Sequence, residues 1–325
     1  MRATIRFALV LLLVTASAVT AAPTPTELLR WVPTDAQVVM AVDVAAFRAH
    51  PFVQGWIIEH QAAWTGIDSD LHRFLRDAGL DPLRDVDLMI VAGNAQEQEG
   101  HALALLAGRY DPASLQAAMN ARGAVSETLG GVTLFLGRDE DGRGAVAMPS
   151  AELLIAGDEA AVRTALAGSA TRRTLVSGAV AAGHIDVRAP FWLVAAVPDQ
   201  LRQGVATASP QVDGEHADTI RSVLGAGGTI QRVAMQARLD KELTLSGVAV
   251  TDTAENAERV CDAVKGALAA ARLRLRENHP ELVEVLRDAH VQAWQAEVSG
   301  YVVIPLPLIE TLVAAKPNPA SGPGI

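Results

Sequence analysis

The residues that could do chemistry are scattered along the chain. Eight histidines occur, and no two of them stand four apart with an adjacent glutamate, as they would on a zinc-binding helix. His50 and His60 could ligate a metal, but solvated or locally hydrogen-bonded histidines explain them better. Cys261 follows Val260 in an apolar stripe, whereas a reactive thiolate needs exposure and positive neighbours. We therefore predict a buried structural thiol, no metal site and no cofactor.

Two short motifs imitate functional loops. The glycine-rich stretch 225–228 precedes an expected strand, whereas a dinucleotide fingerprint follows a strand and opens a helix. The acidic stretch 139–142 lacks the further ligands of a calcium loop and lies between two strand-like runs. We interpret the first as a flexible turn and the second as a hairpin turn.

Paired carboxylates are the remaining candidates for acid and base chemistry. Asp68 with Asp70, and Asp85 with Asp87, stand at expected element boundaries, where aspartate commonly caps turns. The chain contains no Gly-x-Ser-x-Gly motif. We assign no catalytic residue. A hydrolase whose acid and base converge from distant segments stays open as the alternative.

Two tryptophans are the candidates for a binding surface. Trp56 and Trp64 are eight residues apart, near one face of a helix, and could form an exposed docking patch. Core packing is the alternative, because Val53 and Ile57 flank Trp56.

Composition limits the class of protein. The 325 residues are 50% hydrophobic and 20% charged, so the chain can bury enough apolar surface to fold. Its single cysteine excludes an internal disulfide framework. The formal net charge of -10 disfavours nucleic acid, which binds basic patches. Arg272, Arg274 and Arg276 form one basic cluster, but alternate positions cannot form one continuous helical stripe. We predict no nucleic-acid partner.

Residues 1–22 have the pattern of a secretory signal peptide. Arg2 and Arg6 precede an apolar run from Phe7 to about Val14, and small residues lead to Ala21 and Ala22. This pattern predicts cleavage near Ala22 and export to the periplasm or the extracellular space. A retained membrane anchor is the rival interpretation, but a span needs about 20 strongly apolar residues. No stable membrane span is expected after cleavage.

The rest of the chain divides into two segments of similar order, 30–168 and 188–316. The first has an expected strand near 36–43, a hairpin over 86–109, a helix beginning at Asp111-Pro112, short strands between 125 and 156, and a helix over 159–166. The second has an expected strand over 191–196, a hairpin over 230–250, a long helix capped by Thr251-Asp252, strands near 291–298 and 301–305, and a final helix. The tail, 317–325, is too rich in Pro, Gly and Ser to order itself.

The parallel order of the two segments suggests a duplication. We hypothesise an α+β fold built from tandem duplicated units of strand, helix, hairpin, helix and hairpin, with antiparallel or mixed sheets and helices on one face. An arrangement without a repeat is the alternative, because residue identity between the segments is low.

Several motifs of the first segment resemble one group of proteins. The opening Val32-Pro33-Thr34-Asp35-Ala36 leads to Val42-Asp43, and Gly108-Arg109-Tyr110-Asp111 and 156–162 follow. These motifs are similar to those of a family of uncharacterised exported bacterial proteins with no established activity. The resemblance covers mainly residues 30–168 and implies a fold and an exported location, without catalytic residues.

The strong apolar pattern and the scattered polar residues together favour binding over catalysis. We expect an exported, non-enzymatic protein that binds a protein or envelope component. A periplasmic hydrolase is the alternative. The sequence pattern does not fix an oligomeric state.

Overall fold

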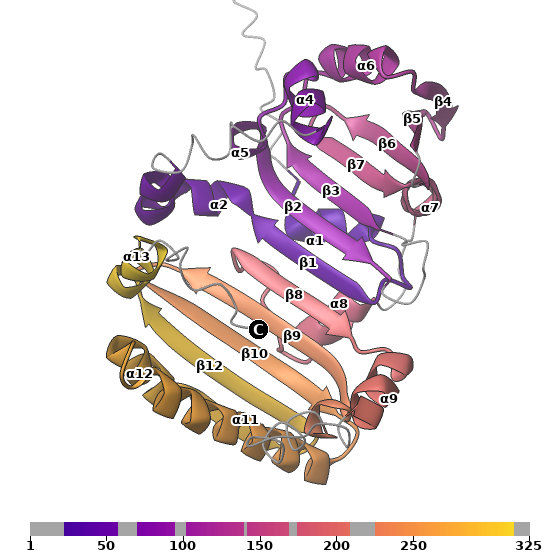
Figure 1. Cartoon of the computed structure of the whole chain (residues 1–325). Coiled ribbons are helices and arrows are strands. Elements are labelled where there is room, and N and C mark those ends of the chain that lie inside the picture. Colours follow the sequence, from indigo (N-terminus) through magenta and orange to yellow (C-terminus); the bar gives the residue numbers. More distant parts are fainter. Residues whose placement is uncertain are drawn as a thin grey trace, which may run out of the picture.

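The computed structural model describes residues 23–57, 70–94, 102–139, 142–168, 174–208 and 225–314. Within these ranges the strands form one 12-stranded sheet, in the order β11-β12-β10-β9-β8-β1-β2-β3-β7-β6-β5-β4 (Figure 1). Every neighbouring pair is antiparallel. The predicted α+β class with an antiparallel sheet is therefore confirmed.

The strands follow the predicted order along the chain. They are β1 (Val38–Asp43), β2 (Val86–Gly93), β3 (Leu103–Gly108), β4 (Val125–Leu129), β5 (Val132–Asp139), β6 (Gly142–Ser150), β7 (Leu153–Asp158), β8 (Phe191–Ala196), β9 (Ile230–Leu239), β10 (Glu242–Thr251), β11 (His290–Trp294) and β12 (Glu297–Pro305).

The helices connect these strands. They are α1 (Pro25–Leu28), the 3-10 turn η1 (Leu29–Trp31), α2 (Val44–Ala49), α4 (Asp70–Asp77), α5 (Pro82–Asp85), α6 (Pro112–Ala121), α7 (Glu159–Ala167), α8 (Leu175–Ala181), α9 (Asp199–Ala208), α11 (Ala254–Leu275), α12 (Pro280–Arg287) and α13 (Leu306–Ala314). α2 ends before Pro51, and residues 51–57 are helical again.

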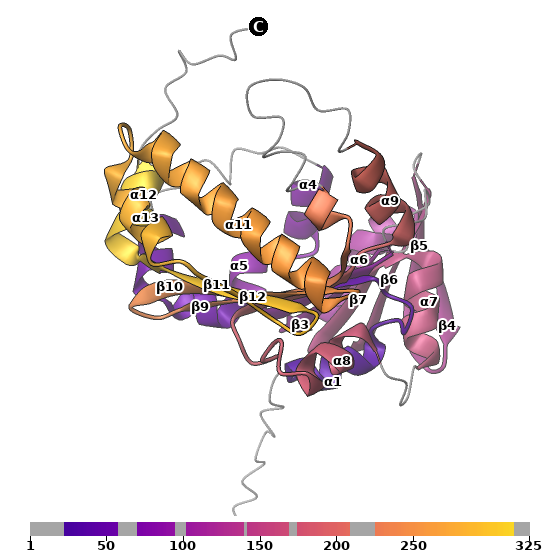
Figure 2. The ribbon, with the colours of Figure 1, turned by 90° about the horizontal axis from the view of Figure 1, so that it is seen from below.

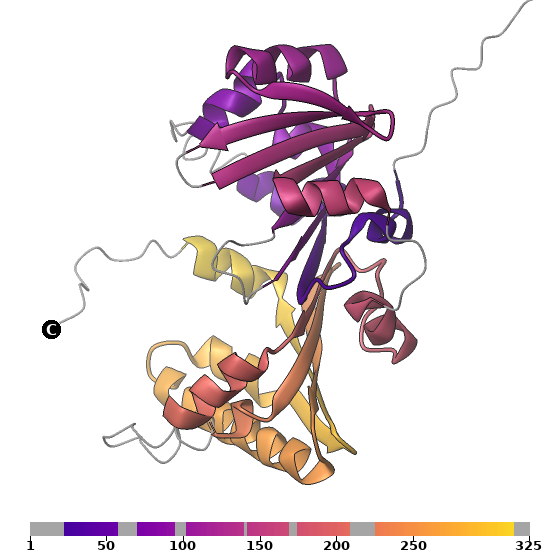
Figure 3. The ribbon, with the colours of Figure 1, turned by 90° about the vertical axis from the view of Figure 1, so that its right-hand side faces the viewer.

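The middle of the sheet joins the two segments of the chain. β1 pairs with β8, so that Val39 lies opposite Val194 and Ala41 lies opposite Trp192. All four of these side chains are buried. Separate sheets for the two segments, as expected from the sequence, are therefore a wrong prediction, because pairing between such distant strands leaves no local pattern. Figure 3 shows the twist of the sheet, whose first-segment strands are seen broadside and whose second-segment strands are seen nearly edge-on.

One face of the sheet carries the largest buried cluster. Leu105 of β3 and Ile155 of β7 lie on this face, opposite each other in the register. Leu28 of α1, Val162 of α7 and Val176 of α8 belong to the same cluster. Three helices from distant parts of the chain therefore cover this face.

The other face is covered too. Leu106 follows Leu105, and Leu154 precedes Ile155. Both therefore point to the opposite side of the sheet. They pack with Leu115 and Met119 of α6 and with Ala78 after α4. Figure 2 shows α4, α6 and α11 on one side of the sheet and α1 and α8 on the other. Helices on one face only is thus a wrong prediction, because consecutive apolar residues are typical of strands buried on both sides.

The long helix α11 packs on the strands of the second segment. Ala257 and Cys261 contact a cluster that includes Val298 of β12. Cys261 is a free, buried cysteine, as predicted from its apolar stripe. Next to this region, Met235 of β9 is 43% exposed while its neighbour Ala234 is buried. The larger of these two apolar residues therefore faces solvent.

The last hairpin differs from its predicted boundaries. The turn lies at Gln295 and Ala296, between β11 and β12, and Gln295 has a left-handed φ of 51°. The expected turn near residue 300 is wrong, because Gly300 lies inside β12. A Cβ on Gly300 would lie 2.8 Å from the carbonyl oxygen of His290, so glycine there permits close approach of the two strands.

A helix unexpected from the sequence connects the two segments. α8 lies within a stretch of small residues that reads as a linker, and Thr174 caps it by accepting a hydrogen bond from the amide of Ser177 (3.2 Å). After this helix the buried His184 places its Nε2 2.9 Å from Oε1 of Glu297 in β12. α8 therefore contributes to the core and its C-terminal loop reaches the second segment.

The loop before β8 is held by an acid-sensitive contact. Asp186 accepts hydrogen bonds from the backbone amide of Arg188 (3.0 Å) and from the side chains of Arg188 and Arg238. These bonds lower the pKa of Asp186 to about 2. A lowered folded-state pKa gives stability that is present above the unfolded value of about 4 and is lost as the pH falls through about 2.

We expect Asp186→Asn to lower the free energy of unfolding by less than about 1 kcal/mol at pH 6, because the ion pairs are partly exposed. The difference from the unsubstituted protein should shrink between pH 4 and pH 2. Urea unfolding at several pH values measures it. A difference that stays constant down to pH 2 would contradict this role of the carboxylate.

Candidate functional site

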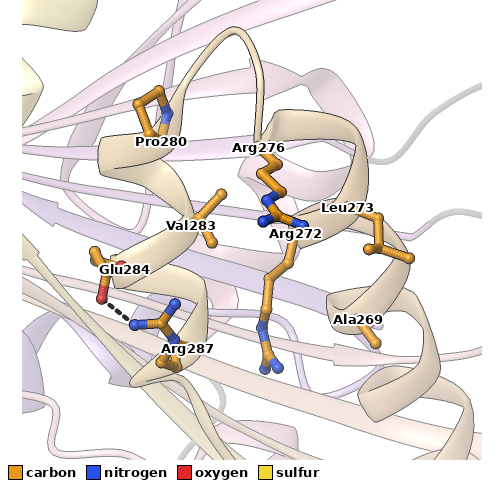
Figure 4. Close-up of a pocket in the computed structure, with 8 residues that line it drawn as sticks. All are labelled: Ala269, Arg272, Leu273, Arg276, Pro280, Val283, Glu284 and Arg287. Carbon is orange, nitrogen blue, oxygen red and sulfur yellow. Dashed lines mark hydrogen bonds and ion pairs between the residues drawn. The ribbon is translucent and has the colours of Figure 1, made fainter.

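The candidate site is a pocket between the last turns of α11 and the helix α12. The chain leaves α11 at Leu275 and re-enters a helix at Pro280, which occupies the first turn of α12 where a missing amide costs nothing. The two helices pack against each other and form the walls of the pocket (Figure 4). Its volume is about 540 Å³, within the range of about 300–1,000 Å³ of small-ligand sites.

Arg272 fixes the geometry of one wall. Its Nε donates a hydrogen bond to the carbonyl oxygen of Leu286 in α12, at 3.0 Å, and the side chain is partly buried. This bond uses one donor of the guanidinium group and satisfies a carbonyl near the end of α12. Within the described part of the chain, the other donors of Arg272 have no hydrogen-bond partner.

Arg276 directly follows α11, four residues after Arg272, and lines the same pocket. Its side chain is exposed, and among the described residues it has no hydrogen-bond or ion-pair partner. On the opposite wall, Arg287 forms an ion pair with Glu284, with 2.6 Å between Nη1 and Oε2. Three guanidinium groups and one carboxylate thus line the pocket, which leaves a local excess of two positive charges.

The rest of the lining is apolar. Ala269 and Leu273 come from α11, and Pro280 and Val283 come from α12. Figure 4 shows Arg272 and Arg276 extending from α11, with Val283 on the wall across from them. Leu273 is 72% exposed. The pocket therefore combines fixed cations with an uncovered apolar surface.

Arginine limits what this pocket can do chemically. A guanidinium group stays protonated at any physiological pH, so it neither gives nor takes a proton. Its planar array of donors matches carboxylate and phosphate oxygens. The arginines also complement the negative ends of the α11 and α12 dipoles. The arrangement suits the binding of an anionic group.

The structure places the predicted docking residues only in part. Trp56 lies in the helical residues 51–57 and is partly exposed, and Trp64 lies outside the described residues. The docking patch therefore stays a prediction. Trp294, by contrast, is 71% exposed at the end of the edge strand β11. The alternation of β11, in which every second residue points outwards, was the signal in the sequence that could have predicted this exposure.

The other candidate residues take structural roles where they are described. His50 has its Nε2 2.7 Å from the carbonyl oxygen of Asp240, and His60 lies outside the described residues. Among the described residues, no three His, Cys, Asp or Glu side chains gather as a metal site would require. β5 and β6 pair up to Asp139 opposite Gly142, as the predicted hairpin requires, while residues 140 and 141 lie outside the described residues.

The second carboxylate pair is engaged in ion pairs. Asp85 contacts Arg84 and Asp87 contacts Arg48, each at 2.7 Å. Bonding to Arg84 lowers the pKa of Asp85. Burial raises the pKa of Tyr110 beside them, and the charges of Asp87 and Asp85 raise it further. Of the other predicted pair, Asp68 lies outside the described residues and Asp70 begins α4.

The arginine pocket was missed in the sequence. We predicted that the three arginines 272, 274 and 276 do not form one continuous stripe. Arg272 and Arg276, however, are four residues apart and line the same pocket. That spacing was a sufficient signal for a pair. The contribution of Arg287 depends on how α12 turns back on α11, which no local pattern reports.

Comparisons with known proteins leave the family open. The sequence matches no model of a known protein family, and no curated protein matches it. Two solved structures, crystal forms I and IV of TP0453, are similar to it with a TM-score of 0.43 and 11% identity in each case. The match covers 91% of this chain and 98% of that one. Among the described residues, no helix has the length and hydrophobicity to cross a bilayer.

Proposed function

We propose that this chain is an exported, non-catalytic binding protein of the cell envelope, and that the pocket between α11 and α12 holds an anionic group of its ligand. The leader pattern of residues 1–22 supports the exported location. One observation carries the binding role: Arg276, which has no partner among the described residues, presents its guanidinium group beside Arg272 in a chain whose formal net charge is -10.

Charge explains why this pocket attracts an anion in an acidic protein. Most of the surface repels anions at long range, but this repulsion is screened within about 8–10 Å at physiological ionic strength. The charged residues that line the pocket are three arginines and Glu284, and Glu284 already pairs with Arg287. An anion that reaches the pocket can therefore accept hydrogen bonds from both Arg272 and Arg276.

We also propose that the two segments arose by duplication. The two segments meet at the seam, the pair of β1 with β8. From this seam outwards, three strands follow one another in each segment, β1-β2-β3 in the first and β8-β9-β10 in the second. In both, the third strand then pairs with the last strand of the segment, β7 or β12. β1 and β8 share the same alternation of buried residues. The extra pair β4 and β5 would be an insertion in the first segment.

Titration with inorganic phosphate tests the binding site. We expect the purified protein to bind phosphate with a dissociation constant of about 1 mM at low ionic strength, and Arg276→Met to weaken it by about tenfold, the effect of one charge-assisted hydrogen bond. Isothermal titration calorimetry measures both. Arg274→Met is the matched control, because Arg274 carries the same charge on the same helix and does not line the pocket.

The control separates a site from a general charge effect. Arg274→Met should bind phosphate like the unsubstituted protein. Equal weakening by the two variants would show that only net charge matters, and this would refute the proposed site. Far-ultraviolet circular dichroism checks that α11 remains helical in each variant.

A further inference from the structure

The apolar residues of the arginine pocket indicate what the anionic group is attached to. Leu273 stands between Arg272 and Arg276 in the sequence and is 72% exposed. Burial of apolar surface is favourable by about 25 cal/mol per Å². A ligand that covers the exposed leucine beside the pocket therefore gains binding free energy.

The opposite wall extends this apolar surface. Pro280 and Val283 of α12 line the pocket across from Ala269 and Leu273 of α11 (Figure 4). Figure 4 shows the side chains of Arg272 and Arg276 between Leu273 on one side and Val283 on the other, while Arg272 bonds to Leu286 and Arg287 bonds to Glu284. A ligand would thus meet positive charge at one part and hydrocarbon at another.

The donors favour a single planar anion. Arg287 is engaged with Glu284, so two guanidinium groups remain, and that of Arg272 has one donor in use. A carboxylate offers two oxygens in a plane, which fits the paired donors of arginine. The carboxylate of Glu284 repels further negative charge near the same wall.

We infer that the ligand of this pocket is a small monocarboxylic acid with an apolar chain or ring, whose carboxylate contacts Arg272 and Arg276 and whose hydrocarbon covers Leu273. This inference rests on the proposed anion-binding function and deepens it. The pocket volume of about 540 Å³ accommodates a molecule of this size.

A series of straight-chain acids tests the inference. Acetate, butyrate, hexanoate and octanoate carry the same head group, so only contact with the apolar wall changes along the series. A fully buried methylene tightens binding by about fourfold, and an open pocket gives about half of that gain in free energy, or about twofold. We expect octanoate to bind on the order of 10- to 60-fold more tightly than acetate and to displace phosphate.

Two variants test which residue contacts the hydrocarbon tail of octanoate and which contacts its carboxylate head group. Leu273→Ser should weaken octanoate by about threefold or more and leave phosphate binding unchanged, whereas Arg276→Met should weaken both. Leu201→Ser is the matched control, since Leu201 is also exposed, at 57%, but belongs to α9. Octylamine, with the same tail and a positive head, should not compete.

The outcomes distinguish the two proposals. If phosphate binds through Arg276 but octanoate binds no more tightly than acetate, the amphipathic ligand is refuted and the anion site stands. If octanoate binds equally well to Arg276→Met, or octylamine competes, the hydrocarbon binds elsewhere and the inference is wrong. If neither phosphate nor any acid binds, both proposals fail.

Discussion

Trp192→Ala is expected to lower the free energy of unfolding by about 3–5 kcal/mol, the cost of removing a large aromatic side chain from a core. Trp192 is 0% exposed and lies in β8, opposite Ala41 of β1. Its indole Nε1 donates a hydrogen bond to the carbonyl oxygen of Val187 at 3.1 Å. Alanine would leave a cavity at the seam between the two segments and a carbonyl group without its donor.

Urea unfolding followed by far-ultraviolet circular dichroism measures this change. Trp294→Ala is the control, because Trp294 is 71% exposed and its replacement should change stability by less than about 0.5 kcal/mol. Similar losses in both variants would show that burial at the seam does not set the stability.

Gly108→Ala should be as damaging, for a steric reason. A Cβ on Gly108 would lie 1.9 Å from the carbonyl oxygen of Asp85 and 2.9 Å from its carbonyl carbon. Both groups belong to the backbone, so no side-chain rotation can relieve the clash. The end of β3 must then move away from Asp85, and the hydrogen bond from the amide of Arg109 to the same oxygen (2.9 Å) would be lost.

We expect a loss of at least about 3 kcal/mol for this substitution, the upper range for overpacking. Thermal unfolding measures it. Gly144→Ala is the matched control, because Gly144 is also in a strand and nothing lies within 4 Å of its added Cβ. A Gly108 variant as stable as the Gly144 variant would mean that the close approach to Asp85 is absent in solution.

The elements of this fold were largely predictable because they depend on local patterns. Alternating apolar residues identify β9, and Asp111 followed by proline marks the start of α6, where its carboxylate accepts from the amide of Ala113 (3.1 Å). α8 was missed because its small residues resemble a linker. The hairpin turn at Gln295 was missed because Gly300 is a stronger turn signal.

The arrangement of the elements was less predictable, because it depends on pairings between distant residues. Nothing near Val39 indicates that Val194 lies beside it. The same holds for the candidate site. The spacing of Arg272 and Arg276 can be read from the sequence, but the approach of Leu286 to Arg272 follows from the packing of two helices.

The pairing of β1 with β8 has a consequence for how this protein can respond to a ligand. Many binding proteins with two domains close around a ligand by rotation about a hinge. Here such a movement would break the backbone pairing of β1 with β8, which runs from Val38 opposite Ala195 to Val42 opposite Phe191. We therefore expect the two segments to move together rather than to close around a ligand.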